Sequence, residues 1–384
     1  MERTQIVRDR RVSSWEEVGS RVAAARAAAG FTQQQLAERV GLHRSALTRV
    51  EQGQRHLDAL ELVQLAGALG RSADWFVSSP PGAIASHRRI RSDDKDMRRL
   101  EDILEAVTRD VELLDEINEL RATTLPNLAL PKIETIEDAQ SAATTVREVL
   151  PAGKDGPIHG LSEQVEHVGL CGFSFNLGPQ VIDGGYVRVN NVGVAVVNGS
   201  TPAGRRRFSL AHELGHHVMG DEYSADFAIG QSREDRERLI NAFAIHLLMP
   251  GASVHSRWAQ LRRDGHESRA ALIVIAAESR VSWAAACGHV CNLELVDVNE
   301  HDRLAIQRPT AVDYIELGVR FDQELEPVSL PAGYARAVLG AYRRYKIGRV
   351  RAIELLRGTV APEELPEPNE LPIDALRSDF AEIG

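Results

Sequence analysis

The sequence has little of what marks secreted or membrane proteins. Only three cysteines occur in 384 residues, too few to build a disulfide framework. No run of about 18 apolar residues is present to span a bilayer. The opening stretch, MERTQIVRDRRVSSWEE, lacks the apolar core of a secretory signal. We therefore expect a cytoplasmic protein that has no membrane segment and works in a reducing compartment.

The N-terminal quarter of the chain lacks the acidic excess that the rest of the sequence has. Residues 1–99 carry 17 Lys and Arg against 12 Asp and Glu, a net +5, whereas the whole chain has a net charge of −10. A mildly basic segment ahead of an acidic remainder indicates that only the N-terminal part meets a polyanion. The length of 384 residues predicts two or three domains.

Residues 14–77 have the pattern of short helices separated by turns. FTQQQLAERVG takes Thr32 as its N-cap, Gly41 lies in a turn, and LHRSALTRVEQGQ follows. This is the order of a helix-turn-helix, whose second helix enters the major groove of double-stranded DNA. Gln33 and the backbone around Thr32 would anchor phosphates. The side chains expected to face outward are Gln33, His43, Arg44, Ser45, Thr48 and Arg49.

The stretch FTQQQLAERVGLHRSALTRVEQGQR resembles the XRE-type (Cro/C1-like) helix-turn-helix family. The resemblance implies an all-α DNA-binding domain over residues 14–77, with Glu51 in the internal scaffold. His43 stands where the family usually has serine, so its contact with a base is left open. Because one such domain seldom holds an operator alone, a homodimer on a double-stranded DNA operator is implied.

Residues 78–124 predict a linker followed by a connecting helix. SSPPGA breaks the chain at 78–83, and residues 93–121 keep a helical period with apolar side chains on one face. This helix would connect two domains, dimerise, or pack on its own domain.

Residues 125–300 mix strand and helix patterns. YVRVN and GVAVVNG are β-branched runs bounded by Gly and Asn, whereas RRRFSLAHELGHHVM and EDRERLINAFAIHLLMP have a helical period. Residues 301–360 predict a mostly helical C-terminal region with a possible strand at YIELGVR (314–320). The acidic, proline-rich tail over 361–384 is expected to be disordered.

The motif HELGH at 212–216 carries the candidate chemistry. His212 and His216 are four residues apart, share one face of a helix and can bind one metal ion. Glu213 would lie beside that ion as the general base of a hydrolase. Gly215 would allow another helix to pack closely, and we expect His217 off the metal face, in solvent. A site of this type needs a third protein ligand.

RRRFSLAHELGHH, together with NAFAIHLLMP, resembles the ImmA/IrrE family of metallopeptidases over roughly residues 125–300. The resemblance implies an α+β zincin-like (gluzincin) domain that binds Zn²⁺ and cleaves a regulatory protein, such as a transcriptional repressor. It also implies an edge strand beside the metal that pairs with the substrate peptide. GVAVVNG is either that edge strand or a plain core strand.

Leu239 departs from the family pattern, because it occupies the position of the usual glutamate ligand. Leucine cannot bind zinc, and we favour Glu237, which stands four residues before Asn241, as the third ligand. The alternatives are Glu234, Asp226, Asp221, His246 or no third ligand at all. Tyr223 and His255 are the candidates for stabilising an oxyanion.

The leading hypothesis is a multidomain transcriptional regulator that binds DNA and cleaves a repressor through a zinc site, in stress response or in the control of a mobile element. A second hypothesis is a repressor whose metal domain is inactive and senses a metal or a partner. A third is a toxin–antitoxin component. Cys287 and Cys291, which flank His289, are expected to be small buried groups and not a second metal site.

Overall fold

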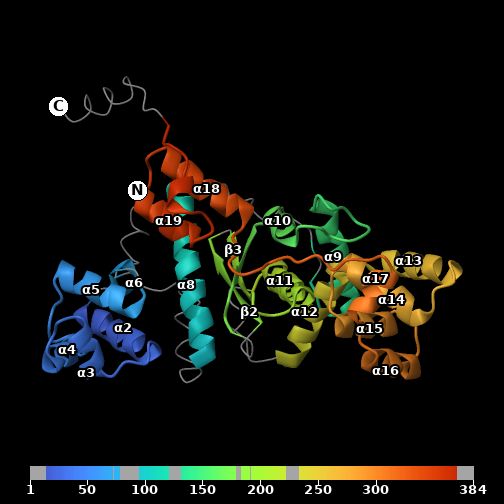
Figure 1. The fold of residues 1–384 in the computed structure, drawn as a ribbon, viewed down its shortest axis with the longest axis horizontal. Coiled ribbons are helices and arrows are strands. Elements are labelled where there is room, and N and C mark those ends of the chain that lie inside the picture. Colours follow the sequence, from blue (N-terminus) through green and yellow to red (C-terminus); the bar gives the residue numbers. More distant parts are fainter. Residues whose placement is uncertain are drawn as a thin grey trace. The chain divides into compact units, whose positions relative to one another are not determined.

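The computed structural model describes residues 14–71, 73–77, 95–120, 130, 132–178, 183–190, 192–221 and 233–369. The chain divides into two compact units between Ala106 and Val107. This division falls inside helix α8 (Lys95–Glu116) (Figure 1). Each unit has a hydrophobic core of its own.

Ahead of α8, the first unit is helical. Its elements are α2 (Trp15–Ala28), α3 (Gln33–Arg39), α4 (Arg44–Glu51), α5 (Ala59–Leu69) and α6 (Ala73–Val77). Val22, Leu36 and Leu47 are fully buried where α2, α3 and α4 pack together. Gly41 has φ +70 in the turn between α3 and α4, a conformation that glycine adopts without strain. The helix-turn-helix predicted from the sequence is therefore present.

Helix α8 contributes buried ion pairs to both units. In the first unit, Arg21 donates to Glu105 at 2.8 Å. In the second unit, Asp110 accepts from Arg351 at 2.9 Å and also from Arg357. Because a buried charge is costly unless it is paired, each half of α8 is anchored to its own unit. This supports the connecting-helix interpretation of residues 93–121.

The second unit contains one three-stranded sheet with the order β1-β3-β2. Its strands are β1 (Leu170–Phe175), β2 (Gly184–Val189) and β3 (Val192–Asn198). β1 runs parallel to β3, and β2 runs antiparallel to it. β3 is paired on both sides and all seven of its residues are buried. GVAVVNG is therefore the central core strand and not an edge strand; β1 and β2 lie at the two edges.

The other regular elements of the second unit, apart from the second half of α8 and a short 3-10 turn, are helices. They are α9 (Ile136–Val149), α10 (Leu161–Glu166), α11 (Ala203–Val218), α12 (Arg233–Leu248), α13 (Gly251–Arg263), α14 (Ser268–Ser279), α15 (Trp283–Asn292), α16 (Val298–Ile306), α17 (Ala311–Glu316), α18 (Ala332–Arg343) and α19 (Arg349–Leu356). α11 packs directly on the sheet, and α12 packs on both α11 and α9 (Figure 1). The two segments with helical patterns around the HELGH motif thus lie side by side.

The strand expected at 314–320 is wrong. Residues Ala311–Glu316 form α17, which begins at Thr310 with a capping box that involves Asp313. This local pair satisfies the first N–H groups of a helix, and it outweighs the β-branched character of the segment. The first residues of the tail that was expected to be disordered, 361–369, pack on the second unit: Leu365 is buried, and the Asn369 N–H donates to Arg343 O at 3.0 Å. The rest of the predicted disordered tail, 370–384, lies outside the described residues.

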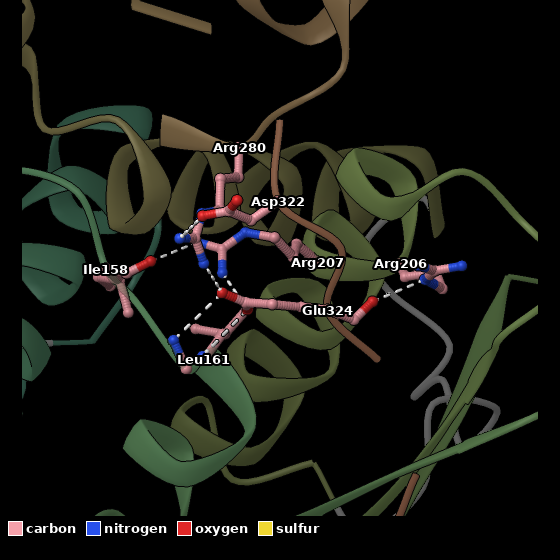
Figure 2. A network of polar contacts seen from close by, with 8 residues as sticks. Ile158, Leu161, Arg206, Arg207, Arg280, Asp322 and Glu324 are labelled. Atoms are coloured by element: carbon pink, nitrogen blue, oxygen red, sulfur yellow. Dashed lines mark hydrogen bonds and ion pairs between the residues drawn. The ribbon is translucent and has the colours of Figure 1, made fainter. Parts of the chain in front are cut away.

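Glu324 ties the segment after α17 to the start of α11. The Arg207 side chain is fully buried and donates to Glu324, as does Arg280. The same carboxylate accepts from the N–H groups of Gly160 and Leu161 at 3.2 and 3.3 Å. Figure 2 shows these contacts converging on one carboxyl group.

Arg206 reinforces this connection. Its guanidinium donates to the main-chain oxygens of Glu324, Gly199 and Thr201 at 2.8 to 3.1 Å, and Figure 2 shows the contact with Glu324. Two of the three consecutive arginines at 205–207 are therefore buried scaffold residues. The segment around Glu324 is structurally part of the unit that holds the HELGH helix, although it lies more than a hundred residues later in the sequence.

No single helix among the described residues is long and apolar enough to cross a membrane. α14 and α15 meet the length and composition test only as a pair, and they are bent by 113°. Most of the apolar side chains of α14 are buried in the core of the second unit.

Candidate metal centre and nucleic-acid interface

Close packing of α11 on α12 positions the candidate metal residues. A Cβ placed on Gly215 would lie 2.9 Å from Ile240 Cγ2 and 3.2 Å from Phe243 Cδ1. The two helices can therefore approach only because residue 215 has no side chain. This confirms the packing role predicted for Gly215.

Three side chains converge between these helices. The Nε2 atoms of His212 and His216 lie 3.2 Å apart. Glu237 Oε2, from α12, lies 3.2 Å from His212 Nε2. Potential ligand atoms of the three residues all lie within 4.8 Å of one another. The structure thus brings together the three residues that the sequence favoured as a ligand set.

The outer nitrogen of each histidine has its own oxygen partner. His212 Nδ1 lies 3.0 Å from Asn241 Oδ1, and His216 Nδ1 lies 2.8 Å from Asp221 Oδ2. Asp221 also accepts from Arg236 at 2.7 Å. When Nδ1 donates to these oxygens, each Nε2 keeps its lone pair for a metal. Asp221 is therefore placed as an orienting residue and not as the third ligand.

The remaining alternatives for the third ligand are not in the cluster. Leu239 is buried in the core. His246 packs edge-on against His289, with ring centroids 4.7 Å apart. Asp226 and the side chain of Glu234 lie outside the described residues.

Glu213 has the environment of a buried base. Its Oε1 atom lies close to Gly184 of β2, its side chain is only 5% exposed, and Oε2 accepts no hydrogen bond from any residue that the structure describes. Burial raises the pKa of Glu213, and the nearby His216 and His212 partly offset that shift. A buried carboxylate oxygen without a donor is costly, which points to a group that this site holds when complete.

The charges around His212 favour its protonated form when no metal is present. Burial on its own lowers the pKa of His212, but the hydrogen bond to Glu237 and the charge of Glu213 outweigh it and raise the pKa overall. A divalent cation at Nε2 would take the place of that proton. The cluster therefore has the negative surroundings that a metal ion needs.

His217 was expected in solvent, and that expectation is wrong. His217 is 1% exposed. Its Nδ1 lies 2.8 Å from Tyr186 Oη, and its Nε2 lies 3.0 Å from Val168 O. Burial lowers the pKa of His217 to about 4. This imidazole is therefore neutral, and its two contacts join α11 to the sheet and to the residues just before β1. The sequence gives no sign of Tyr186 as its partner.

β2 offers an open strand edge next to Glu213. Among the described residues, β2 has a neighbouring strand on one side only. Asn198 N–H donates to Asp183 O at 2.8 Å, so the alternating pattern leaves the main-chain groups of Gly184, Tyr186 and Arg188 pointing away from β3. A Cβ on Gly184 would lie 3.0 Å from Glu213 Oε1. The open edge thus begins at the buried base.

The two oxyanion candidates receive no support from the geometry. Tyr223 lies outside the described residues. His255 is exposed on α13 and is not among the three clustered residues.

In the first unit, the candidate DNA-contacting residues gather on α3 and α4. His43, Arg44, Ser45 and Arg49 are exposed. Thr32 caps α3, and its side chain accepts from Gln35 N–H. α4 and its N-cap residue therefore present an imidazole, a hydroxyl and one guanidinium group to solvent at the start of the helix, and a second guanidinium group, that of Arg49, in its last turn.

A hydrogen-bond network holds α3 and α4 in register. Glu51 accepts from Arg26 at 2.6 Å and from Gln33 at 2.7 Å. Thr48 Oγ1 donates to Gln33 Oε1 at 3.2 Å. Gln33 is thus partly engaged within the unit, and Glu51 is a scaffold residue, as the family resemblance implied.

Comparison with known families finds one match for the helix-turn-helix and one for the domain that holds the histidine cluster. Residues 22–76 match the helix-turn-helix family model, and residues 175–289 match the model of the IrrE N-terminal-like domain, in the peptidase family M78. No curated protein matches the chain. The first match contains α3 and α4, and the second contains α11 and α12.

Proposed function

We propose that this chain, which joins an XRE-type helix-turn-helix domain to an IrrE-like peptidase domain, is a cytoplasmic transcriptional regulator with a zinc-dependent endopeptidase site. The observation that carries the proposal is the convergence of His212, His216 and Glu237 beside the unpartnered Oε2 of Glu213. The substrate we infer is a transcriptional repressor or another regulatory protein.

The donor set fits a zinc ion. Two imidazole nitrogens and one carboxylate oxygen, with room for one further ligand, form the usual composition of a catalytic zinc site. Bound zinc would supply Lewis acidity to a peptide carbonyl. Asn241 and Asp221 would hold the two imidazole rings in place through their Nδ1 atoms.

Glu213 would transfer the proton from water to the leaving amine during peptide hydrolysis. Its buried Oε2 accepts a proton from the attacking water and returns it to the nitrogen of the departing amine. Burial raises the pKa of Glu213, which makes this carboxylate a stronger base for the first of these two transfers. Gly184 leaves the space that Glu213 occupies.

The open edge of β2 would bind the substrate. An extended peptide can add to a free strand edge through main-chain hydrogen bonds. The outward groups of Gly184, Tyr186 and Arg188 supply such an edge, and its first residue lies beside Glu213. This favours a segment of protein, in extended form, as the substrate.

The first unit would bring the peptidase to DNA. The beginning of α4 would enter a major groove, where Arg44 and Ser45 reach base edges, His43 and Arg49 lie close by, and Thr48 supports them. Thr32 and Gln33 would anchor the phosphates at the start of α3. Two copies of the chain, as a homodimer on two half-sites, would supply the affinity that one domain lacks.

Cleavage of a co-expressed repressor tests the proposed activity. The natural candidate is a repressor encoded beside the gene for this chain. We expect the Glu213→Gln variant to retain zinc but to cleave at least about 100-fold more slowly, because the general base is lost. The exposed Glu363→Gln variant is the control and should cleave normally. Wild-type cleavage by Glu213→Gln would reject the assignment of the base. Zinc binding without any cleavage by the native chain would favour the metal-sensing repressor.

A further inference from the structure

A pocket of about 560 Å³ lies in the second unit, and none of its lining residues belongs to the metal cluster. Its walls come from the residues that follow α8, the end of α10, the first residues of β1 and β3, and α18 with the residues after it. Its volume falls in the range of about 300–1,000 Å³ that is typical of sites for small molecules.

The floor of the pocket is apolar. It is formed by side chains that are all less than a tenth exposed: Leu120, Leu170, Cys171, Val192 and Ala337. Burial raises the pKa of the Cys171 thiol to about 12, so this group remains an uncharged part of the floor. Such a surface favours an apolar body over a small hydrated ion.

The rim is positively charged. Arg344 and Lys346 both bind Glu119, whose side chain is only 1% exposed. Arg344 uses Nε and Nη2 for this pair, and the donors of Nη1 have no hydrogen-bond partner among the described residues. The hydrogen bond from Arg344 is the main cause that lowers the pKa of Glu119. One carboxylate is thus matched by two cations.

Arg336 adds a third cation to the rim. It is exposed on α18 and forms no hydrogen bond or close ion pair within the part of the chain that the structure describes, and its charge acts on Glu166, where it counters the burial that raises the pKa of that carboxyl group. Glu166, the other acidic residue of the lining, accepts from Gly333 N–H at 2.7 Å and so caps the start of α18. The lining therefore carries three cations against two carboxylates, a formal charge of +1.

We propose that this pocket binds an amphipathic organic anion, with its charged group against Arg336 and Arg344 Nη1 and its apolar body on the floor. The charged group is a carboxylate or a phosphate monoester, because a guanidinium pairs with either. A ligand of this kind satisfies both surfaces at once, which neither a neutral hydrocarbon nor a free inorganic anion does. The inference is independent of the proposed peptidase activity.

Calorimetric titration of the full chain tests the proposal with four probes. Octanoate and hexyl phosphate carry both features, whereas octan-1-ol carries only the apolar body and inorganic phosphate carries only the charge. We expect saturable binding of octanoate or hexyl phosphate, and the tighter of the two identifies the charged group. Octanol and phosphate should bind at least about tenfold more weakly.

Variants locate the binding in this pocket. Arg336→Gln should lower the affinity for the organic anion by about tenfold or more, since a charge-assisted hydrogen bond is lost. Ala337→Leu, whose larger side chain would fill part of the floor, should lower this affinity as well. Arg343→Gln, an exposed neighbour on α18 that does not line the pocket, should bind like the native chain. The proposal is overturned if neither organic anion binds, if inorganic phosphate binds as tightly, or if Arg336→Gln and Arg343→Gln bind equally well.

Discussion

At the scale of single residues, the candidate metal site depends on side chains that hold other side chains. His216 is oriented by Asp221, which is itself fixed by Arg236, and His212 is oriented by Asn241. Sequence spacing predicted the two histidines and Glu213, because the i, i+4 relation on a helix is short-range. It favoured Glu237 through its four-residue spacing from Asn241 but left Asp221 open, since both are nearby carboxylates and only the packing of α11 on α12 gives them different positions.

Asp221→Ala should weaken zinc binding without abolishing it. Loss of an outer partner of a metal-binding histidine typically costs about 10- to 100-fold in affinity. The measurement is competition for zinc with a chromophoric chelator. Asp264→Ala, at the exposed end of α13, is the matched control. Equal zinc affinity of the two variants would show that Asp221 does not orient the site.

Arg44→Ala should weaken binding to an operator selected from random DNA by about 1–3 kcal/mol, if the guanidinium contacts a base edge. Arg44 is exposed at the start of α4. The affinity is measured at several salt concentrations, because phosphate contacts alone depend strongly on salt. Arg263→Ala, exposed on α13, should have no effect. An unchanged affinity for Arg44→Ala at every salt concentration contradicts the docking of α4.

His289 should make the second unit sensitive to acid. Burial lowers its pKa to about 4 from about 6.5 in an unfolded chain. Between these values the unfolded state binds more protons, so the free energy of unfolding falls as the pH drops from about 6.5 to about 4. His289 alone would contribute a loss of about 3 kcal/mol.

Unfolding in urea, measured at pH 7 and at pH 4.5, checks this expectation. His289→Gln can keep the donor to Met249 O and should lose less stability on acidification than the native chain. His167→Gln, at the exposed end of α10, should behave like the native chain. Identical pH dependence of His289→Gln and the native chain would refute the role of His289.

At the scale of elements, the contact of α11 with α12 limits what can stand at position 215. A Gly→Ala change in a helix usually stabilises by up to about 1 kcal/mol through helix propensity. At Gly215, however, the added Cβ would lie 2.9 Å from Ile240 Cγ2, and overpacking of a core costs about 1–3 kcal/mol. We therefore expect Gly215→Ala to lower the thermal midpoint.

Gly288→Ala provides the matched control for that change. Gly288 lies inside α15, and a Cβ there would meet nothing within 4 Å. Its thermal midpoint should stay level or rise. If both variants shifted the midpoint in the same upward direction, the close approach of α11 and α12 would be wrong.

Periodic elements could be predicted from the sequence, and the others could not. α3, α4, α11 and α12 have apolar positions that repeat with the turn of a helix. β1, LCGFSF, was not predicted, because a buried parallel strand has no alternation of polar and apolar residues. The β-branched residues at 314–320 favour a strand, but the capping box at Thr310 begins a helix just before them.

At the scale of the whole molecule, the chain combines two family domains with helices that neither family model covers. The matches end at residues 76 and 289. Beyond them, α8 carries ion pairs into both units, and Glu324 joins a late segment to the arginines of α11. Such long-range pairs leave no mark in local sequence patterns. The composition and motifs predicted the two domains, but the attachment of the C-terminal segment needed the structure.

The most direct test of the central claim is the zinc K-edge X-ray absorption spectrum of the full chain after dialysis against zinc. We expect about one zinc per chain, with two imidazole nitrogens and oxygen in its first shell, and a marked loss of zinc in Glu237→Ala. A chain that retains no zinc, a spectrum without imidazole ligands, or full zinc content in Glu237→Ala would contradict the metal centre assigned to His212, His216 and Glu237.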